Sequence, residues 1–465
     1  MYIFESENHN FLQKEMSKDI RLKKGLNINL KGEADKVYAS IPQSELFSLK
    51  PTDFHGLTPK LNVKIGDKVK AGTCVFFDKY NERIRFSSPV SGEVTDIIRG
   101  AKRRILEVKI KSDTETNYES FSILDDSASR EQVIEALLES GVWPFIRQKP
   151  FDIIANPIDI PKAIFISTFN TAPLAPDNDF VLHGLENEFQ TGIDFLKKLT
   201  DGKIHLNVDG NTNPSTVFTS CKGVQINKIS GAHPAGNVGI QIHHIDPINK
   251  GDVVWYLYPQ DVLIIARLFS NGKYDVSRIV ALTGSQVEKP RYYRTIAGAN
   301  VKNLLDENTL IGDNNRFISG DVLTGEKIDE DGNIGFYDSQ VTVIEEGNHQ
   351  EFLGWIAPNL DKFSISKSYF SWLMPSKKYS LNTNYNGEER AYVVTGQYEK
   401  VLPMDIYPMQ LIKACLIEDI DSMEELGIYE ISAEDVALCE FVCTSKMELQ
   451  SIIREGLDLI KKECS

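Results

Sequence analysis

The spacing of hydrophobic residues alternates between strand-like and helix-like along this chain. Residues 66–110 hold short apolar runs separated by turn-forming Gly, Asp, Pro and Ser residues, which is typical of a small β-domain. The apolar runs at 162–167 and 203–208 predict buried strands, and the run at 216–219 is interpreted as another. The segment from Gly184 onward has the spacing of an amphipathic helix. Strand, helix and strand in this order predict a wound α/β sheet.

The remainder of the pattern predicts one more helix and two further modules. Residues 127–138 form a short helix, with Ser127 or Ser129 as its N-cap. Residues 279–305 alternate β-like runs with turn signals, which predicts a small mixed β-grasp-like module. Helical spacing over 409–417 and 433–462 then predicts a helical C-terminal domain. The fold class expected is therefore α/β and α+β, in several domains.

The turns of the first module resemble those of lipoyl and biotinyl carrier domains. In such domains a Gly-Asp turn, here at Gly66, and a Pro-Val-Ser-Gly turn, here at Pro89, bracket a hairpin that carries a modifiable lysine. Asn81 stands in the place of that lysine, and Lys79 is two residues out of register. Because an amide cannot accept an acyl cofactor, we expect the sandwich fold without the carrier chemistry.

Composition excludes several classes of protein. The chain has 465 residues, of which 41% are hydrophobic, and this length predicts about three domains. The net charge of −15 disfavours a sequence-independent nucleic-acid binder, which needs clustered Lys and Arg to displace phosphate counterions. The apolar runs at 253–258 and 262–269 are shorter than the ~18 residues of a spanning helix. The N-terminus lacks the pattern of a secretory signal, so we expect a cytoplasmic protein.

Cysteine and tryptophan residues are interpreted as structural. Six cysteines in so long a chain indicate reduced thiols rather than a disulfide framework. Cys439 and Cys443 have helical spacing, but a metal site would need two more ligands, so packing on a helix is favoured. Trp255 and Trp355 lie in apolar runs and are expected in the core.

The segment 231–247 (GAHPAGNVGIQIHHIDP) combines closely spaced glycines with three histidines. Glycines let a backbone approach a ligand, and imidazoles titrate near neutral pH. The spacing does not match a dinucleotide or nucleoside-triphosphate motif. His243 and His244 are adjacent and would point to opposite faces of a strand, which argues against shared metal ligation. For this segment, a structural loop is favoured about two to one over a ligand or partner contact. No other motif in the sequence identifies an active site.

Many ordered motifs resemble one family, the NqrA family of the bacterial sodium-translocating NADH:quinone reductase. They include the segments DIRLKKGLNI, DFHGLTPKLNV, GDKVKAG, FSSPVSGEV, RGAKRRILEVKI, NTAPLAPD, SGAHPAGNVGIQIHHIDP, PQDVLIIARLFSNG, VEKPRYYRTIAGA, RFISGDVLTG and SAEDVALCEFVC. The resemblance implies four domains: a barrel-sandwich hybrid within 1–115, a Rossmann-like α/β domain at 116–255, a soluble-ligand-binding β-grasp domain at 256–365 and a helical domain at 366–465.

The family is similar in domain plan to the flavin-bearing subunit of respiratory complex I, which holds FMN and NADH over a glycine-rich loop. At that place this chain has SGVWPF, where Trp143 adds bulk and Pro144 removes a backbone donor. The resemblance therefore implies the architecture without FMN and without an iron–sulfur cluster. Two residues depart from the family pattern, Gln241 in the place of a histidine and Pro259 between Tyr258 and Gln260.

By resemblance, the chain is expected to be a peripheral subunit on the cytoplasmic side of the bacterial inner membrane. It would belong to a six-subunit pump that passes electrons from NADH through flavins to quinone and exports Na⁺. If quinone binds this chain, the expected contacts are His233, Pro234, Gly236, His243 and His244. The alternatives are a free-standing flavin- or nucleotide-dependent oxidoreductase and an assembly scaffold of the complex.

Overall fold

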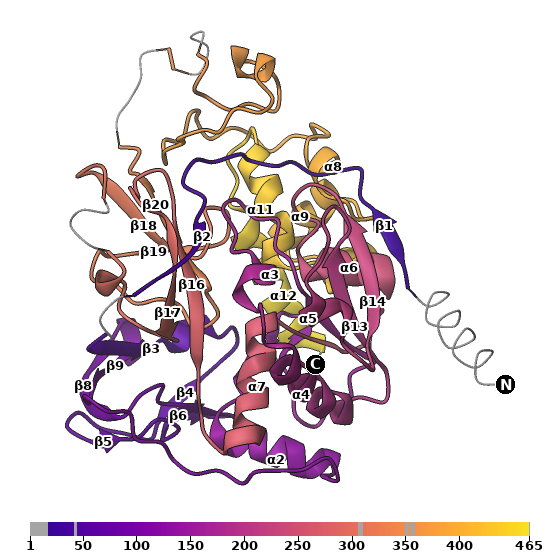
Figure 1. Cartoon of the computed structure of the whole chain (residues 1–465). Coiled ribbons are helices and arrows are strands. Elements are labelled where there is room, and N and C mark those ends of the chain that lie inside the picture. Colours follow the sequence, from indigo (N-terminus) through magenta and orange to yellow (C-terminus); the bar gives the residue numbers. More distant parts are fainter. Residues whose placement is uncertain (1–16, 41–43, 306–309, 349–352, 355–358, 465) are drawn as a thin grey trace, which may run out of the picture.

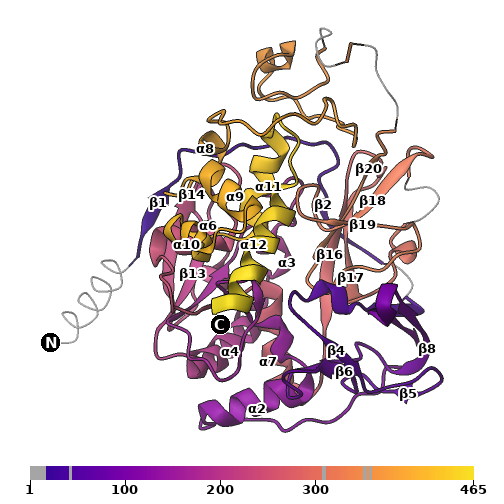
Figure 2. The same cartoon turned by 180° about the vertical axis from the view of Figure 1, so that it is seen from behind.

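The computed structural model describes residues 17–40, 44–305, 310–348, 353–354 and 359–464. Figure 1 shows two β-rich domains on the left, the α/β domain in the centre and on the right, and the C-terminal helices behind the α/β domain. Figure 2, seen from behind, places the C-terminal helices across the α/β domain. The expected fold class, with its barrel-sandwich, Rossmann-like, β-grasp and helical parts, is confirmed.

The central sheet of the α/β domain has the strand order β1-β14-β13-β12-β15-β10-β11. The first five strands of this order run parallel, and β10 pairs antiparallel with both β15 and β11. The strand bounds are β1 Asp19–Arg21, β10 Arg147–Lys149, β11 Ile153–Ile154, β12 Ala163–Ser167, β13 Lys203–Asp209, β14 Gln225–Ser230 and β15 Val254–Leu257. The helices around it are α2 Arg130–Ser140, η3 Trp143–Phe145, α3 Asn178–Val181, α4 Glu186–Leu196, η4 Lys197–Leu199, α5 Thr216–Thr219, α6 Val238–Ile245 and α7 Pro259–Asn271.

Both faces of the central strands are buried, so their sequences read as continuous apolar runs. On β12, Ile164 and Ile166 pack towards the β-rich domains, whereas Phe165 packs towards the C-terminal helices. On β15, Trp255 and Tyr256 divide in the same way. The alternation follows from the two-residue repeat of a strand, and it places the sheet between two separate cores.

The barrel-sandwich part pairs two small sheets, in the orders β3-β9-β8-β5 and β4-β6-β7. Its bounds are β3 Leu46–Leu49, η1 Pro51–Asp53, β4 Pro59–Leu61, β5 Lys68–Val69, β6 Cys74–Asp78, β7 Arg85–Ser87, β8 Gly92–Arg99, η2 Ala101–Arg103 and β9 Ile105–Ser112. Asn81 lies in the turn between β6 and β7, as the resemblance to carrier domains predicts.

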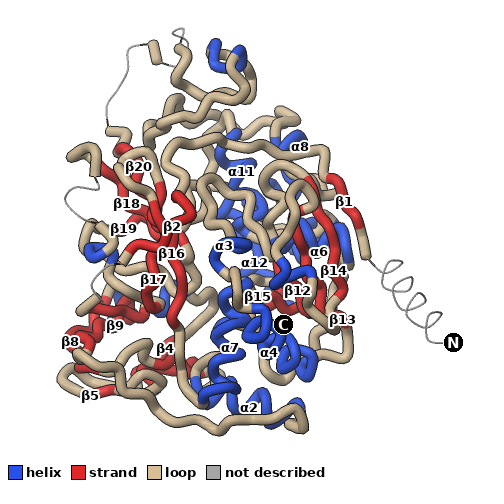
Figure 3. The backbone as a smooth tube through the Cα atoms, in the orientation of Figure 1, coloured by secondary structure: helices blue, strands red, loops and turns tan. Residues whose placement is uncertain are grey.

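The β-grasp part has the strand order β19-β18-β20-β16-β17-β2. Its bounds are β2 Asp35–Ala39, β16 Ser277–Thr283, β17 Arg291–Ile296, η5 Val301–Asn303, β18 Asn315–Ser319, β19 Glu326–Ile328 and β20 Gln340–Glu345. The N-terminal segment therefore contributes to two other domains, since β1 joins the α/β sheet and β2 joins this one. This exchange ties the domains together and is visible in the tube of Figure 3.

The C-terminal helices are η6 Phe370–Leu373, α8 Tyr398–Val401, α9 Pro408–Leu416, α10 Ile420–Glu425, η7 Ile428–Glu430, α11 Ala433–Val442 and α12 Leu449–Cys464. The helices from α8 to α12 pack against the face of the central sheet that carries Phe165 and Tyr256, whereas η6 lies apart from this core. The predicted helical domain is present, although the single pattern over 433–462 is two helices rather than one.

Two predictions about local structure were wrong. Residues 216–219 are a helical turn, α5, because Ser215 caps its N-terminus by accepting the backbone N–H of Val217. His243 and His244 lie on helix α6 rather than on a strand. Trp255 is in the core as expected, whereas Trp355 lies outside the described residues.

Candidate functional site

The larger cavity of the described residues, of about 490 Å³, opens where several strands of the central sheet end. Ser167 closes β12 and Asn170 follows it, and both line the cavity. His233 follows β14, and Tyr258 follows β15. Ligands of open α/β sheets bind in the crevice outside the carboxyl ends of the strands, so this cavity is the candidate site.

Every part of the fold contributes to the walls of this cavity. The barrel-sandwich part supplies Lys50, Asp53 and His55, and the β-grasp part supplies Asp321 and Tyr337, among others. The C-terminal helices close it with Glu434, Gln450 and Arg454. A site of this kind is complete only when all four parts are folded and docked.

Hydrogen bonds to its backbone and a contact to its ring hold His233 at the cavity wall. Its backbone N–H donates to Asn27 Oδ1 at 2.9 Å, and its carbonyl accepts the N–H of Leu26 at 2.8 Å. Its ring Nδ1 lies 3.2 Å from the hydroxyl of Thr171, which itself accepts the N–H of Gly236 at 2.9 Å. The Thr171 hydroxyl retains its own proton for donation to Nδ1, and in that arrangement the imidazole proton lies on Nε2.

The Nε2 atom of His233 is buried and has no hydrogen-bond partner among the described residues. Burial lowers the pKa of His233 to about 4, against the opposing charge of Asp321, so the ring is neutral at pH 7. A buried N–H without an acceptor costs free energy unless a ligand or water supplies one. His233 is therefore neutral at pH 7, and its Nε2 is a buried polar atom at the cavity wall whose hydrogen-bonding capacity is unused within the described residues.

The glycines near His233 allow close packing of the backbone. A Cβ on Gly236 would lie 2.6 Å from the backbone nitrogen of Thr171, and one on Gly239 would lie 2.4 Å from Asp435 Oδ2 of α11. Both positions accept only glycine without a local shift. The glycine spacing that is unusual in the sequence is thus used for the turn before α6 and for the contact between α6 and α11.

Gln241, one of the two residues that depart from the family pattern, completes a buried polar network below His233. Its Oε1 accepts from Asn207 Nδ2 at 2.8 Å, and its Nε2 donates to Ser167 Oγ at 2.8 Å. Pro259, the other residue that departs from the family pattern, lies in the first turn of α7, where a missing backbone N–H is tolerated.

The other candidate residues of the glycine and histidine segment lie around this loop. Pro234 follows His233 through a cis peptide bond. His243 lies 2.7 Å from Glu430 and accepts the backbone N–H of Asp405 through Nε2, and His244 lies 2.7 Å from the carbonyl of Pro403. The structure therefore brings His233 and Gly236 to the cavity, while His243 and His244 hold α6 against the C-terminal helices.

Arg147, which sequence reasoning missed, lies at the centre of a cage of tyrosine rings in the cavity wall. Its guanidinium carbon is 4.5 Å from the ring centre of Tyr256, 4.7 Å from that of Tyr258 and 4.4 Å from that of Tyr337. Stacking on aromatic faces stabilises a poorly hydrated cation and fixes its plane. The only signal in the sequence is an arginine in the short strand β10, so no motif identifies it.

Next to this cage, Lys149 is a buried cation that bridges two domains. Its Nζ donates to Ser432 Oγ at 2.7 Å and lies 4.0 Å from Asp152 and 3.9 Å from Asp435. The side chain of Lys149 is 2% exposed. Burial opposes its charge, but Asp152 and Asp435 outweigh that effect and raise the pKa of Lys149. Strand β10 is thereby fixed to the start of α11.

Several carboxyl groups of the cavity are held partly or wholly protonated by burial. Burial raises the pKa of Asp53 to about 7, although it accepts the N–H of Phe336. Burial also raises the pKa of Glu434 to about 7, against the charge of Lys149. Groups that titrate near neutral pH can exchange protons with a bound substrate.

The segment SGVWPF turns its bulky residues inward. Trp143 Nε1 donates to the carbonyl of Ala155 at 2.7 Å, and Phe145 stacks on Phe336 of the β-grasp part at 4.5 Å. The carbonyl of Pro144 accepts the hydroxyl of Tyr337 at 2.7 Å. Aromatic packing thus occupies this loop, and the absence of FMN from the chain stays a prediction.

Cys439 and Cys443 are buried, as the packing interpretation expects. Cys443 Sγ accepts the hydroxyl of Tyr398 at 2.8 Å, and burial raises the pKa of Cys439 well above its ordinary value. Within the described part of the chain, no group of three or more His, Cys, Asp or Glu side chains has the geometry of a metal site.

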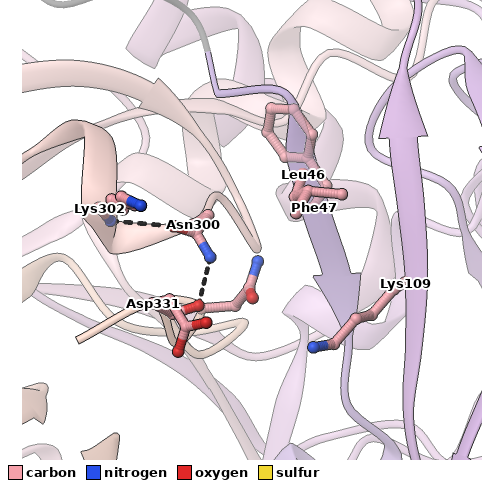
Figure 4. A pocket seen from close by; sticks show the side chains of 7 residues that line it. Leu46, Phe47, Lys109, Asn300, Lys302 and Asp331 are labelled. Carbon is pink, nitrogen blue, oxygen red and sulfur yellow. Dashed lines mark hydrogen bonds between the residues drawn. The ribbon is translucent and has the colours of Figure 1, made fainter. Parts of the chain in front are cut away.

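A second, smaller cavity of about 180 Å³ lies between the barrel-sandwich and β-grasp parts (Figure 4). Asn300 at its edge accepts the N–H of Lys302 at 3.0 Å and donates to the carbonyl of Asp331. The polar groups of Asn300 thus hold the turn at η5. The larger cavity therefore remains the candidate functional site.

Comparison with known proteins identifies the family. Three domain models match: the NqrA N-terminal barrel-sandwich hybrid domain at 20–113, the NqrA second alpha/beta domain at 128–274 and the NQRA C-terminal domain at 279–330. The NqrA protein of the Na(+)-translocating NADH-quinone reductase of Rhodopirellula baltica is 38% identical over 449 residues, covering 95% of this chain and 98% of that one. The chain belongs to the NqrA family.

The corresponding protein of Haemophilus influenzae strain PittGG is also 38% identical, and the match covers 96% of this chain and all of the relative. That of Pasteurella multocida is 38% identical over 451 residues, with the same coverage. In the described residues of this family member, no helix combines the length and hydrophobicity needed to cross a membrane. The family resemblance indicated by the ordered motifs is therefore confirmed.

Proposed function

We propose that this chain serves as the peripheral NqrA component of a sodium-translocating NADH:quinone reductase, on the cytoplasmic side of the bacterial inner membrane. The observation that carries the proposal is the match to NqrA relatives over 95% of the chain and nearly all of theirs. Its partners are the other subunits of the membrane complex, which supply the NADH and flavin chemistry and the path for Na⁺. The chain alone does not turn over substrate.

Within that complex, we propose that the larger cavity binds quinone. A quinone carbonyl oxygen is a hydrogen-bond acceptor, and the unpartnered Nε2 of His233 is a donor in the tautomer whose Nδ1 accepts from Thr171. Phe54 and Phe336 provide apolar wall for a ring, and the Gly236 backbone lets the ring approach the loop. His243 and His244 keep α6 in place behind this loop. Asp53, with its pKa near 7, is a proton donor for quinone reduction.

Equilibrium titration of the isolated chain with a short-tailed ubiquinone analogue tests the quinone site. We expect saturable binding, and a loss of about tenfold in affinity for His233→Ala, as removal of one useful hydrogen bond predicts. His183 is exposed on a loop of the α/β domain, so His183→Ala is the matched control and should bind as the native chain does. Unchanged affinity in His233→Ala removes the assignment to His233, and no saturable binding leaves the scaffold role.

A pull-down tests the assignment to the complex. The tagged chain is recovered from mildly solubilised native membranes, and the eluate is assayed for sodium-stimulated NADH:quinone reductase activity. Recovery of that activity with membrane subunits is expected. A lone chain that is yellow and oxidises NADH by itself contradicts the proposal and indicates the free-standing oxidoreductase.

A further inference from the structure

A segment before the C-terminal helices projects from the body of the protein with apolar side chains at its tip. In Figures 1 and 2 it is the orange loop at the top edge, beyond the β-grasp and helical parts. It contains the short helix η6, Phe370–Leu373. Phe370, Trp372 and Leu373 are 53%, 50% and 61% exposed, which is far more than side chains of this size show in a core.

The direction of these side chains is fixed by the residues between them. Tyr369 is buried and its hydroxyl donates to the carbonyl of Gly354 at 3.0 Å. Ser371 is buried and donates to the carbonyl of Lys362 at 2.6 Å. Because Tyr369 and Ser371 point inward, Phe370 and Trp372 are held outward. The base of the segment is anchored separately, since Phe363 packs against Tyr379 and Phe441.

The charge of this segment is opposite to that of the chain. Residues 359–380 contain four lysines, at 362, 367, 377 and 378, and a single acidic residue, Asp361, whereas the whole chain carries −15. Two of these lysines have carboxylate partners, since Lys377 pairs with Asp361 at 2.6 Å and Lys378 pairs with Glu33 at 3.0 Å. Lys367 lies over the ring of Trp372, with its Nζ 5.7 Å from the ring centre. A net negative protein is repelled by a negatively charged surface, so a local basic tip decides which part of it approaches.

We propose that this segment docks on the surface of an anionic lipid bilayer. Aromatic and leucine side chains enter the interface between headgroups and acyl chains, and lysines attract the anionic headgroups. Each lysine near such a surface strengthens binding by about fivefold, and the apolar tip adds to that. The docking proposal does not rest on quinone binding, because the segment contributes no residue to the larger cavity.

Co-sedimentation of the full chain with vesicles tests the proposal. The vesicles are an equal mixture of phosphatidylglycerol and phosphatidylcholine, or phosphatidylcholine alone. We expect binding to the anionic vesicles, weaker binding at high salt, and at least about tenfold weaker partitioning for the triple variant Phe370→Ser, Trp372→Ser and Leu373→Ser. Ile158 and Ile160 are 77% and 57% exposed on a loop of the α/β domain, so their double serine variant is the matched control and should bind normally.

Fluorescence gives a second measurement that does not depend on the triple variant. The emission of Trp372 should shift to the blue on anionic vesicles, and the Trp372→Phe variant should still bind while it loses that shift. The proposal is overturned if the native chain does not bind anionic vesicles, or if the triple variant binds them as tightly as the control variant does. If vesicles are ignored but the triple variant fails to co-purify with membrane subunits, the segment docks on a protein instead.

Discussion

Removing the charge of Lys149 should weaken the docking of the C-terminal helices on the α/β domain. The Lys149→Met variant keeps the length and much of the volume of the side chain, so little cavity is created. It deletes the hydrogen bond to Ser432 and leaves Asp152 and Asp435 without their shared cation. The side chain of Asp435 is fully buried, and that of Asp152 is 16% exposed.

The expected loss of folding free energy follows from removing one partner of a buried ion pair. Such a removal destabilises proteins by about 3–5 kcal/mol, because the remaining charge stays buried without a partner. For an unfolding unit of 150–250 residues this corresponds to a fall in Tm on the order of 10 °C. The matched control is Lys60→Met, since Lys60 and Glu82 form an ion pair in which both side chains are mostly exposed. Such pairs contribute little, so the control should change stability by less than about 1 kcal/mol.

The effect of Lys149→Met should also depend on pH. Burial by itself would raise the pKa of Asp152, but Lys149 and Arg147 outweigh it and hold that pKa below its ordinary value. In the native chain this carboxylate contributes stability above its unfolded pKa, and the contribution is lost as pH falls through the folded pKa. Without Lys149 the Asp152 carboxylate gains a proton more readily, because Lys149 lowers its pKa in the native chain. The deficit of the variant is therefore largest near neutral pH and shrinks towards pH ~4.

Thermal unfolding followed by circular dichroism, at several pH values between 4 and 8, measures both effects. Tryptophan fluorescence separates the domains, because Trp143 and Trp255 are both buried in the α/β domain. A Lys149→Met variant that unfolds within a degree or two of Lys60→Met at every pH would show that the cation does not hold the two parts together.

Three further predictions concern packing, a buried donor and a titrating carboxyl. Gly192→Ala places a methyl group 2.4 Å from the carbonyl of Val262, so it should cost about 1–3 kcal/mol in urea unfolding, and no change would mean that α4 and α7 can move apart. Trp143→Phe leaves the carbonyl of Ala155 unpaired and should lower stability by about 1–3 kcal/mol, measured in the same way. Burial raises the pKa of Asp53 to about 7, so ionising this carboxyl in the folded chain costs stability as pH rises from 4 to 7. The Asp53→Asn variant should therefore have a higher Tm than the native chain at pH 8 and no higher Tm at pH 5.

Hydrophobic patterning predicts most of the fold because burial decides which periodicity a segment must follow. The strands at 162–167 and 203–208 are β12 and β13, and the helix from Gly184 onward is α4. The pattern fails at 216–219, where four residues are too few to show a period and the cap of Ser215 decides the outcome. It also fails to show that β1 and β2 leave the N-terminal part for two other sheets, since strand pairing over such distances depends on tertiary packing.

The site is harder to predict because it is made by docking. The glycine and histidine segment is recognisable in the sequence, and His233 does reach the cavity. Its two other histidines have the same chemistry but, because they lie on helix α6, they contact the C-terminal part instead. Arg147 and Lys149 carry no motif at all, since an isolated basic residue in a strand is usually a solvated one. Only the arrangement of four domains makes them buried cations.

This dependence on docking links the two proposals physically, although neither rests on the other. The cavity is closed by Glu434 and Arg454 of the C-terminal helices, and the start of α11 is held to β10 by Lys149. The segment that carries the tip at Phe370–Leu373 precedes those same helices in the chain, and the base of the segment packs against α11 through the contact of Phe363 with Phe441. This contact joins the base of the segment to helix α11, whose first turn carries Glu434 of the cavity wall. If that contact matters, Phe441→Ala should change quinone affinity in the presence of anionic vesicles more than in their absence, and equal effects in both conditions would show that the tip and the cavity act separately.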